Sequence, residues 1–148
     1  MVKFKISVLM PVYNSENYLT SSIESILSQS FKNFEFIVVD DASTDNSLEI
    51  IEKYKHNDKR IVLIKNKFNL GTTRSLNLGL LIANGKYMVR MDADDWSYPS
   101  RLKTQYEYME KNNEISVSGG AIDVCNEDLN TNYNRKYPLT DSEIRKKI

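Results

Sequence analysis

The residues that stand out for possible chemistry are three aspartates directly after an apolar run. Asp92, Asp94 and Asp95 follow the strand-like segment 87–91. Alternate residues of a strand face the same way, so Asp92 and Asp94 can present their carboxylates together. Carboxylate oxygen is the ligand that Mg²⁺ and Mn²⁺ prefer, and Mg²⁺ is commonly held by one or two carboxylates plus substrate phosphates. The alternative for so short a motif is a solvated acidic turn that caps the next helix.

Apolar runs of strand length alternate along the chain with segments of helical periodicity. Runs rich in Val, Ile and Leu predict strands that are buried on both faces, and apolar residues recurring every three or four positions predict helices. Such alternation indicates an α/β fold with a mainly parallel sheet flanked by helices. We expect strands over 6–12, 34–39, 61–64, 87–91 and 115–124, and helices beginning near Ser15, near Ser43 or Thr44, after Arg74, near Pro99 and at a capping box over 140–143. In the third helix we expect Leu76, Leu80 and Ala83 to face the sheet.

Polar residues occur at the end of each of the first four predicted strands. Right-handed crossovers bring the carboxyl ends of parallel strands to one edge of a sheet, and open α/β sheets bind their ligands at that edge. We therefore expect the segments 11–14, 40–41, 69–74 and 92–95 to meet. Together they offer carboxylates for a cation and Arg74 for phosphate oxygens, as a metal-bridged phosphate ligand requires.

The two aspartates at positions 40 and 41 are interpreted differently. The carboxylate of Asp41 is a pure acceptor, so it can receive an N–H group from a ligand such as a uracil ring. For Asp40 we expect a structural role, in which its charge lies against the positive end of the following helix. No GxGxxG motif follows the first strand and no Gly-Lys-Ser/Thr loop occurs, which argues against a dinucleotide-binding Rossmann domain and a P-loop NTPase.

Composition restricts the class of protein. The 148 residues fit one domain, and 41% hydrophobic with 27% charged residues is normal for a soluble globular chain. Acidic and basic residues balance, so nothing indicates nucleic acid as a partner. A single cysteine, Cys125, and a single histidine, His56, give no zinc site. No apolar stretch is long enough to span a bilayer, so we expect a cytoplasmic protein, with peripheral association at the inner face of the membrane left open.

Several short motifs, taken in order, resemble those of the inverting family 2 glycosyltransferases with the GT-A fold, a Rossmann-like architecture. The resemblance runs from about Ile6 to Asp123, nearly the whole chain. Each motif is weak alone, and the strength of the match lies in their order. The matching pieces are Val8–Asn14, Val38–Asp45, Asn69-Leu70-Gly71 with Asn77 and Gly79, Asp92–Asp95, and Pro99–Leu102 with Gln105.

The resemblance implies a donor site for a nucleotide-diphosphate sugar, expected to be a UDP-sugar, with Mn²⁺ or Mg²⁺. Asp41 would receive the uracil imide, and Asp94 with Asp92 would hold the metal. Family members often place a basic residue two positions after Arg74, where this chain has Leu76, so packing or a surface salt bridge is the alternative for Arg74. The implied nucleotide-sugar-binding residues are Pro11, Val12, Tyr13, Asn14, Asp41, Arg74, Asp92, Ala93 and Asp94.

The resemblance further implies an inverting transfer of the sugar to a hydroxyl of a glycan or lipid-linked acceptor, in polysaccharide or cell-surface glycan synthesis. Chains of the family are usually considerably longer. We therefore expect residues 1–148 to form the donor-binding domain, truncated at the C-terminus, with the acceptor-binding part and the catalytic base beyond Ile148. Arg101 and Gln105 match the family pattern, and for them we expect a role in fixing the helix that follows the acidic motif.

Two other functions fit an Asp-x-Asp motif at the end of an apolar strand. A phosphotransferase or phosphatase of the haloacid dehalogenase type uses the first aspartate as a nucleophile, but that family places the motif near its first strand. A non-catalytic module that binds a nucleotide-sugar would carry the same donor-binding residues. Metal-dependent binding of UDP distinguishes the first of these alternatives from a glycosyltransferase, and sugar transfer distinguishes the second.

Overall fold

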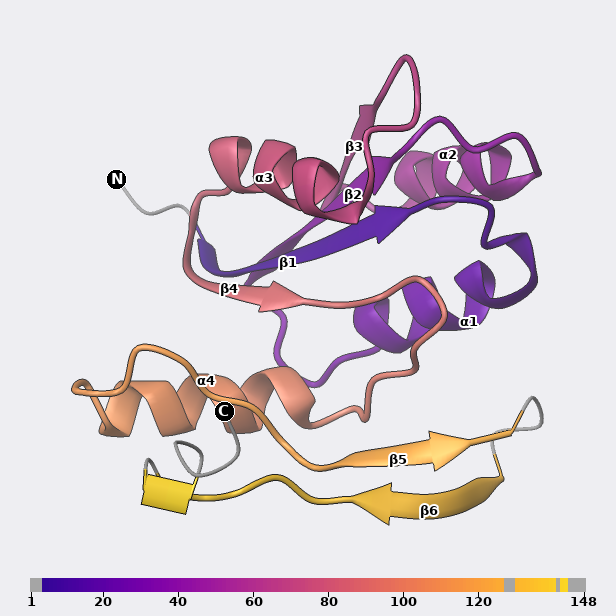
Figure 1. Ribbon diagram of the computed structural model, residues 1–148. Coiled ribbons are helices and arrows are strands. Elements are labelled where there is room, and N and C mark those ends of the chain that lie inside the picture. The colour runs from indigo at the N-terminus through magenta and orange to yellow at the C-terminus, as the bar shows by residue number, and fades with distance from the viewer. Residues whose placement is uncertain (1–3, 127–129, 141, 144–148) are drawn as a thin grey trace. The chain divides into compact units, whose positions relative to one another are not determined.

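The computed structural model describes residues 4–126, 130–140 and 142–143 (Figure 1). The chain divides after Tyr108 into two compact units, which are described separately. No helix in the described part is both long enough and apolar enough to cross a bilayer. In chain order the elements up to the division are β1 (Phe4–Val12), α1 (Glu16–Leu27), β2 (Phe34–Asp40), α2 (Ser47–Asn57), β3 (Ile61–Lys65), α3 (Thr72–Ile82), β4 (Gly85–Arg90) and α4 (Arg101–Lys111), which continues past it.

The first unit is built on a parallel sheet with the strand order β3-β2-β1-β4, which confirms the predicted α/β class. All seven residues of β2 are buried, because this strand lies inside the sheet and is covered on both faces. The burial of β4 instead alternates between partly buried and exposed residues, as expected for a strand at the edge. Near-continuous apolar sequence therefore identified the central strands correctly.

Each face of the sheet carries its own apolar core. One core joins β1 and β2 to residues of α1, α2 and α4, and a smaller one joins Leu9, Ile37 and Val39 to α3 (Figure 1). Ala83 packs into the smaller core as predicted, but Leu80 is 46% exposed. Gly79 faces the sheet instead, where an added Cβ would lie 3.2 Å from Leu9. The helix therefore packs closely through a small residue, which turns its neighbour Leu80 toward solvent.

The second helix begins later than predicted, at Ser47 rather than near Ser43 or Thr44. One carboxylate accounts for this start, because Asp45 accepts hydrogen bonds from the N–H of Ser47 (2.9 Å) and from the N–H of Glu16 (3.0 Å). It thereby satisfies orphan donors at the starts of both α1 and α2.

The helix-end role expected for Asp40 is wrong. Asp40 is the last residue of β2 and lies well before the first turn of α2, which begins at Ser47. Its side chain is buried, and its Oδ1 has no hydrogen-bond partner in the described part of the chain. Its charge therefore does not lie in the first turn of the helix, where the dipole would act on it.

The second unit contains an antiparallel pair, β5 (Ile122–Cys125) and β6 (Thr131–Arg135). The strand predicted over 115–124 is wrong for most of its length, because the exposed pair Gly119-Gly120 lies in irregular chain before β5. The strand β6 was not predicted, because its residues are all exposed and show no apolar alternation. At the predicted capping box, the N–H of Thr140 donates to Glu143 and the N–H of Glu143 donates to the Thr140 hydroxyl. The remainder of the helix predicted there lies outside the described residues.

Candidate functional site

The carboxyl ends of the parallel strands meet at one edge of the sheet, as the sequence predicts. Val12 of β1 pairs with Asp40 of β2, which pairs with Lys65 of β3. On the other side of β1, Leu9 pairs with Arg90, the last residue of β4. The segments that follow these four strands therefore start next to one another. This edge is where open α/β sheets place their ligand sites.

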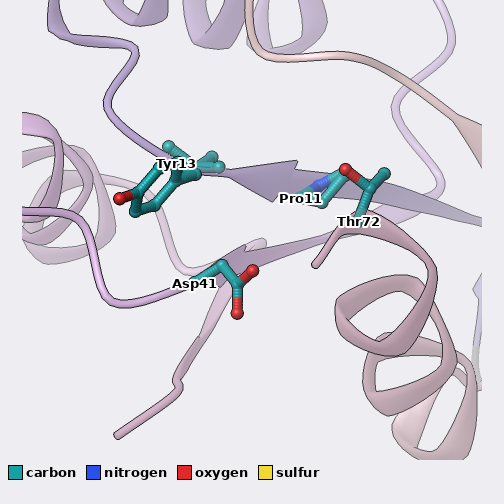
Figure 2. A pocket seen from close by; sticks show the side chains of 5 residues that line it. Pro11, Tyr13, Asp41 and Thr72 are labelled. Carbon is teal, nitrogen blue, oxygen red and sulfur yellow. The ribbon is translucent and has the colours of Figure 1, made fainter. Parts of the chain in front are cut away.

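A small pocket opens at this edge between the segments that follow β1, β2 and β3. Its lining residues are Pro11, Val12, Tyr13, Asp41 and Thr72. Figure 2 shows Pro11 and Tyr13 at the end of β1, with Asp41 and Thr72 on the neighbouring segments around the same space. The ring of Tyr13 is 49% exposed and is therefore available to a ligand. Four of these residues were predicted. Thr72 was missed, although it directly follows the matched motif Asn69-Leu70-Gly71.

Asp41 is fixed by three hydrogen bonds from the loop before α3. Its Oδ1 accepts from Asn66 Nδ2 (2.7 Å) and from the N–H of Leu70 (2.8 Å), and its Oδ2 accepts from the N–H of Gly71 (2.8 Å). Burial raises the pKa of Asp41, but the bonds from Leu70, Asn66 and Gly71, with a weaker one from Ser75, outweigh it, so the pKa lies below 3.8. A carboxylate has about four acceptor positions. Oδ1 accepts the bonds from Asn66 and Leu70, whereas Oδ2 accepts a single backbone bond, so Oδ2 is the oxygen better placed to receive a ligand N–H.

Asn14 has a supporting position, since it does not line the pocket. Its backbone is in the left-handed region (φ 48°), which asparagine tolerates better than most residues. Its Oδ1 accepts from the N–H of Thr44 (2.8 Å), and its own N–H donates to the hydroxyl of Ser43 (3.2 Å). Asn14 therefore ties the loop after β1 to the loop after β2, and its direct contact with a nucleotide stays a prediction.

We call the connection between β4 and α4, residues 91–100, the acid loop. The strand β4 ends at Arg90, so Asp92 and Asp94 are not part of it. The prediction that they face the same way as alternate residues of a strand is therefore wrong. The two lie in a turn, in which the N–H of Asp95 donates to the carbonyl of Asp92 (3.2 Å). Asp92 forms a two-pronged ion pair with the Arg90 side chain (2.9 and 3.1 Å). Asp94 is exposed.

The acid loop contributes no residue to the lining of the pocket in the described structure. Asp94 therefore shares the sheet edge with Tyr13 and Asp41, and a single cavity common to all three stays a prediction. Ala93 is buried in the larger core, so its side chain is turned away from solvent. Only backbone atoms of Ala93 could contact a bound nucleotide-sugar.

The donor set of the acid loop fits a hard divalent cation. Burial raises the pKa of Asp95, and the neighbouring charges of Asp92 and Asp94 raise it further, against the opposing effect of Arg101 and Arg90. Such crowding of carboxylates is relieved by a cation. Among the described residues no group of three or more His, Cys, Asp or Glu side chains is arranged to hold an ion. The remaining ligands would then be phosphate oxygens and water, as is common for Mg²⁺.

Two arginines have different positions near these acids. Arg101, at the start of α4, donates to the carbonyl of Arg90 (2.9 Å) and contacts Met91 Sδ (3.3 Å). These contacts join the first residue of α4 to the end of β4 and the start of the acid loop. Arg74 lies exposed on the first turn of α3, two residues after the pocket residue Thr72. Its side chain is thus free to reach a ligand, and its phosphate role stays a prediction.

Comparison with known proteins agrees with this arrangement. The family model for glycosyl transferase family 2 matches residues 7–148. A putative glycosyltransferase of Bacillus subtilis, EpsE, is 48% identical over 124 residues, which are 83% of this chain and 45% of that protein.

Two solved structures are similar in fold and sequence. Staphylococcus aureus TarS 1–349 in complex with UDP-GlcNAc has a TM-score of 0.69 and 30% identity, over 82% of this chain and 40% of that one. The mannosyltransferase PcManGT from Pyrobaculum calidifontis, in complex with GDP-Man and Mn²⁺, has a TM-score of 0.66 and 25% identity, over 83% and 35%. The chain spans less than half the length of each of these relatives. By the family match and these similarities, the chain belongs to glycosyl transferase family 2.

Proposed function

We propose that this chain is the donor-binding part of an enzyme that transfers a sugar, with inversion, from a UDP-sugar to an acceptor hydroxyl, with Mn²⁺ or Mg²⁺. The observation that carries the proposal is the pocket in which Tyr13 and Asp41 lie together, at the sheet edge where the acid loop also begins. Two structural relatives, by their titles, hold UDP-GlcNAc and GDP-Man, which supports a nucleoside diphosphate sugar as the ligand class.

The base of the nucleotide would be read by Asp41. Its Oδ2 accepts one backbone hydrogen bond against two bonds on Oδ1, so Oδ2 is the proposed acceptor for the single imide N–H of uracil. The exposed ring of Tyr13 lies on the same pocket and offers a face against which the base can stack. Pro11, Val12 and Thr72 complete the wall of the pocket.

The diphosphate would be held beyond the base, between α3 and the acid loop. Asp94 is exposed and would ligate the metal, with Asp92 as a second ligand that must exchange its pairing with Arg90. A bound divalent cation neutralises the negative charge that develops on a leaving diphosphate. Arg74 would meet phosphate oxygens from the first turn of α3.

The acceptor hydroxyl must lose its proton as it attacks the sugar, which calls for a general base. We assign that role to none of the described residues, and we propose that the base belongs to an acceptor-binding part outside this chain. The proposed acceptor is a glycan or lipid-linked hydroxyl in polysaccharide or cell-surface glycan synthesis. Peripheral binding at the inner face of the membrane would place the protein near such acceptors.

Calorimetric titration with UDP, with and without MnCl₂, tests the proposal. Mn²⁺ should tighten the binding of UDP, and in Asp94→Ala this gain should fall by about tenfold, the usual effect of removing a ligand or its support. Glu49→Ala, an exposed acid on α2, serves as the matched control and should keep the full gain. Equal binding of UDP with and without the metal would contradict the proposed metal role.

Two further measurements separate the other functions. Family membership leaves a phosphatase of the haloacid dehalogenase type without support, and release of phosphate from a phosphomonoester without affinity for UDP would reverse that judgement. A non-catalytic nucleotide-sugar module would bind UDP equally well. Transfer of labelled sugar from UDP-sugar by the full-length protein would exclude such a module.

A further inference from the structure

Three buried polar side chains of α1 and the residues after it face the acid loop. Ser22 and Ser25 are three positions apart on one side of α1, and Gln29 lies two residues after the end of that helix. They are 1%, 3% and 0% exposed. Buried polar groups cost free energy unless they are hydrogen-bonded, so a group of three calls for partners. We call these three residues the polar seam.

Ser22 holds the backbone on both sides of Asp94. Its hydroxyl lies 2.7 Å from the carbonyl of Ala93 and 2.6 Å from the carbonyl of Asp95. A hydroxyl has one proton to donate, so the two carbonyls share it. The carbonyls of the two residues that flank Asp94 are thus drawn to one buried point. This fixes the direction in which the exposed carboxylate of Asp94 leaves the backbone.

Ser25 and Gln29 fix the second half of the acid loop. The hydroxyl of Ser25 accepts from the N–H of Ser97 (3.1 Å). Gln29 Nε2 donates to the carbonyl of Tyr98 (2.7 Å), and its Oε1 accepts from the N–H of Leu102 in α4 (3.0 Å). These bonds use both ends of the Gln29 amide. The polar seam therefore contacts the acid loop and the start of α4 over ten residues, from Ala93 to Leu102, chiefly through backbone atoms.

Apolar residues could fill the same buried space, and a well-packed apolar contact is often as stabilising as a buried polar one. What an apolar contact lacks is direction, because it does not specify where each carbonyl and N–H must point. The acid loop carries its charges on exposed side chains, so only its backbone is available to be held in place. Hydrogen bonds to that backbone fix the conformation of the loop and leave its carboxylates available to a ligand.

We propose that Ser22, Ser25 and Gln29 are positioning residues for the metal and diphosphate site, which act through the backbone of the acid loop and touch neither ligand. This inference rests on the proposed function, since it supposes that Asp94 binds a metal ion. It predicts that removal of the Ser22 hydroxyl weakens the metal-dependent part of donor binding specifically.

The test compares Ser22→Ala with Ser21→Ala, the same change at the exposed neighbouring position of α1. UDP affinity is measured by calorimetry with and without MnCl₂. In Ser22→Ala the gain in affinity given by Mn²⁺ should fall by about tenfold, as for other residues that orient metal ligands, while affinity without the metal changes little. The variant should melt at a lower temperature, because two buried carbonyls lose their donor, so circular dichroism is used to confirm that it is folded at the temperature of the titration. Ser21→Ala should keep the full gain. A full gain in Ser22→Ala, or a parallel loss of both affinities, would overturn the proposal.

A second measurement does not depend on any ligand. The amide proton of Ser97 is held by Ser25 and should exchange slowly with deuterium in the unmodified protein. In Ser25→Ala that proton should exchange at least tenfold faster, and amides of the central strand β2 should be unaffected. Absence of a Mn²⁺ effect in the unmodified protein would contradict the proposed function, whereas unchanged exchange at Ser97 would contradict the polar seam itself.

Discussion

The pocket and the acid loop hold their aspartates in opposite ways. At the pocket the carboxylate of Asp41 is itself fixed, because the loop before α3 donates three hydrogen bonds to its oxygens. In the acid loop the fixed atoms are backbone carbonyls and N–H groups, bound by the polar seam, and the carboxylate of Asp94 is exposed. Each arrangement suits a different ligand.

A single N–H donor has a definite direction, and its acceptor is best when it does not move. A divalent cation instead draws several oxygens around itself and needs carboxylates that can adjust to its geometry. The difference indicates that Asp41 supports the fold as well as the proposed site, whereas Asp94 has a role in the proposed metal site alone. Removal of each side chain should therefore have unequal consequences for folding.

The largest expected effect is the loss of stability in Asp41→Ala. This change removes the hydrogen bonds that Asp41 accepts from the Asn66 amide and from the N–H groups of Leu70 and Gly71. We expect the free energy of unfolding to fall by about 3 kcal/mol, because each lost hydrogen bond contributes about 1 kcal/mol. Asp94→Ala, at an exposed position, should change it by less than about 0.5 kcal/mol. Urea unfolding of both variants gives the two free energies. Equal losses would contradict the claim that Asp41, unlike Asp94, supports the fold.

Ligand binding sharpens the same contrast between the two aspartates. The variant Asp41→Ala should weaken the binding of UDP more than that of inorganic pyrophosphate, which lacks the base. Asp94→Ala should weaken both in the presence of Mn²⁺. An equal loss of UDP and pyrophosphate affinity in Asp41→Ala would mean that Asp41 does not read the base.

A smaller effect should appear in the dependence of stability on pH. The pKa of Asp41 in the folded protein lies below 3.8, so its ionised form is favoured by folding. The stability that this charge contributes is complete above the unfolded pKa of 3.8 and is lost as the pH falls through the lower folded value. Asp41→Asn cannot lose that contribution. The difference in unfolding free energy between the two proteins should therefore shrink below pH 3.8, and a constant difference would contradict this explanation.

The sequence predicted the position of Asp41 but not its internal partners. Apolar runs located β1 to β4, and parallel strand topology then placed Asp41 beside Tyr13 at the sheet edge. The bonds from Asn66, Leu70 and Gly71 come from 25 to 30 residues away. Hydrophobic periodicity in the sequence does not predict which loop folds over a carboxylate, because such contacts depend on the path of an irregular segment.

The polar seam was not predicted, for a related reason. Helical periodicity identifies only the apolar stripe of α1, and serines on a helix are usually exposed to solvent. Only the packing of α1 against the acid loop reveals that Ser22 and Ser25 are buried. The late start of α2 was missed likewise, since the N–H of its first residue is bound by Asp45, which also binds the first N–H of α1. Polar contacts between distant loops thus account for most of what the sequence did not reveal at this site.

A smaller loss of stability than that of Asp41→Ala is expected for Asn66→Ala, which removes one side-chain donor to Asp41 and leaves the two backbone donors. The unfolding free energy should fall by about 1 kcal/mol, the net value of one hydrogen bond. Asn66 Nδ2 also lies 3.1 Å from the hydroxyl of Ser75, which itself bonds to Asp41, so Ser75→Ala is measured beside it to test both contacts of Ser75. If Ser75→Ala costs as much as Asn66→Ala, the loss cannot be assigned to the bond between Asn66 and Asp41. If Asn66→Ala alone costs as much as Asp41→Ala, the backbone N–H groups of Leu70 and Gly71 contribute little, and the carboxylate is held by one side chain rather than by the loop.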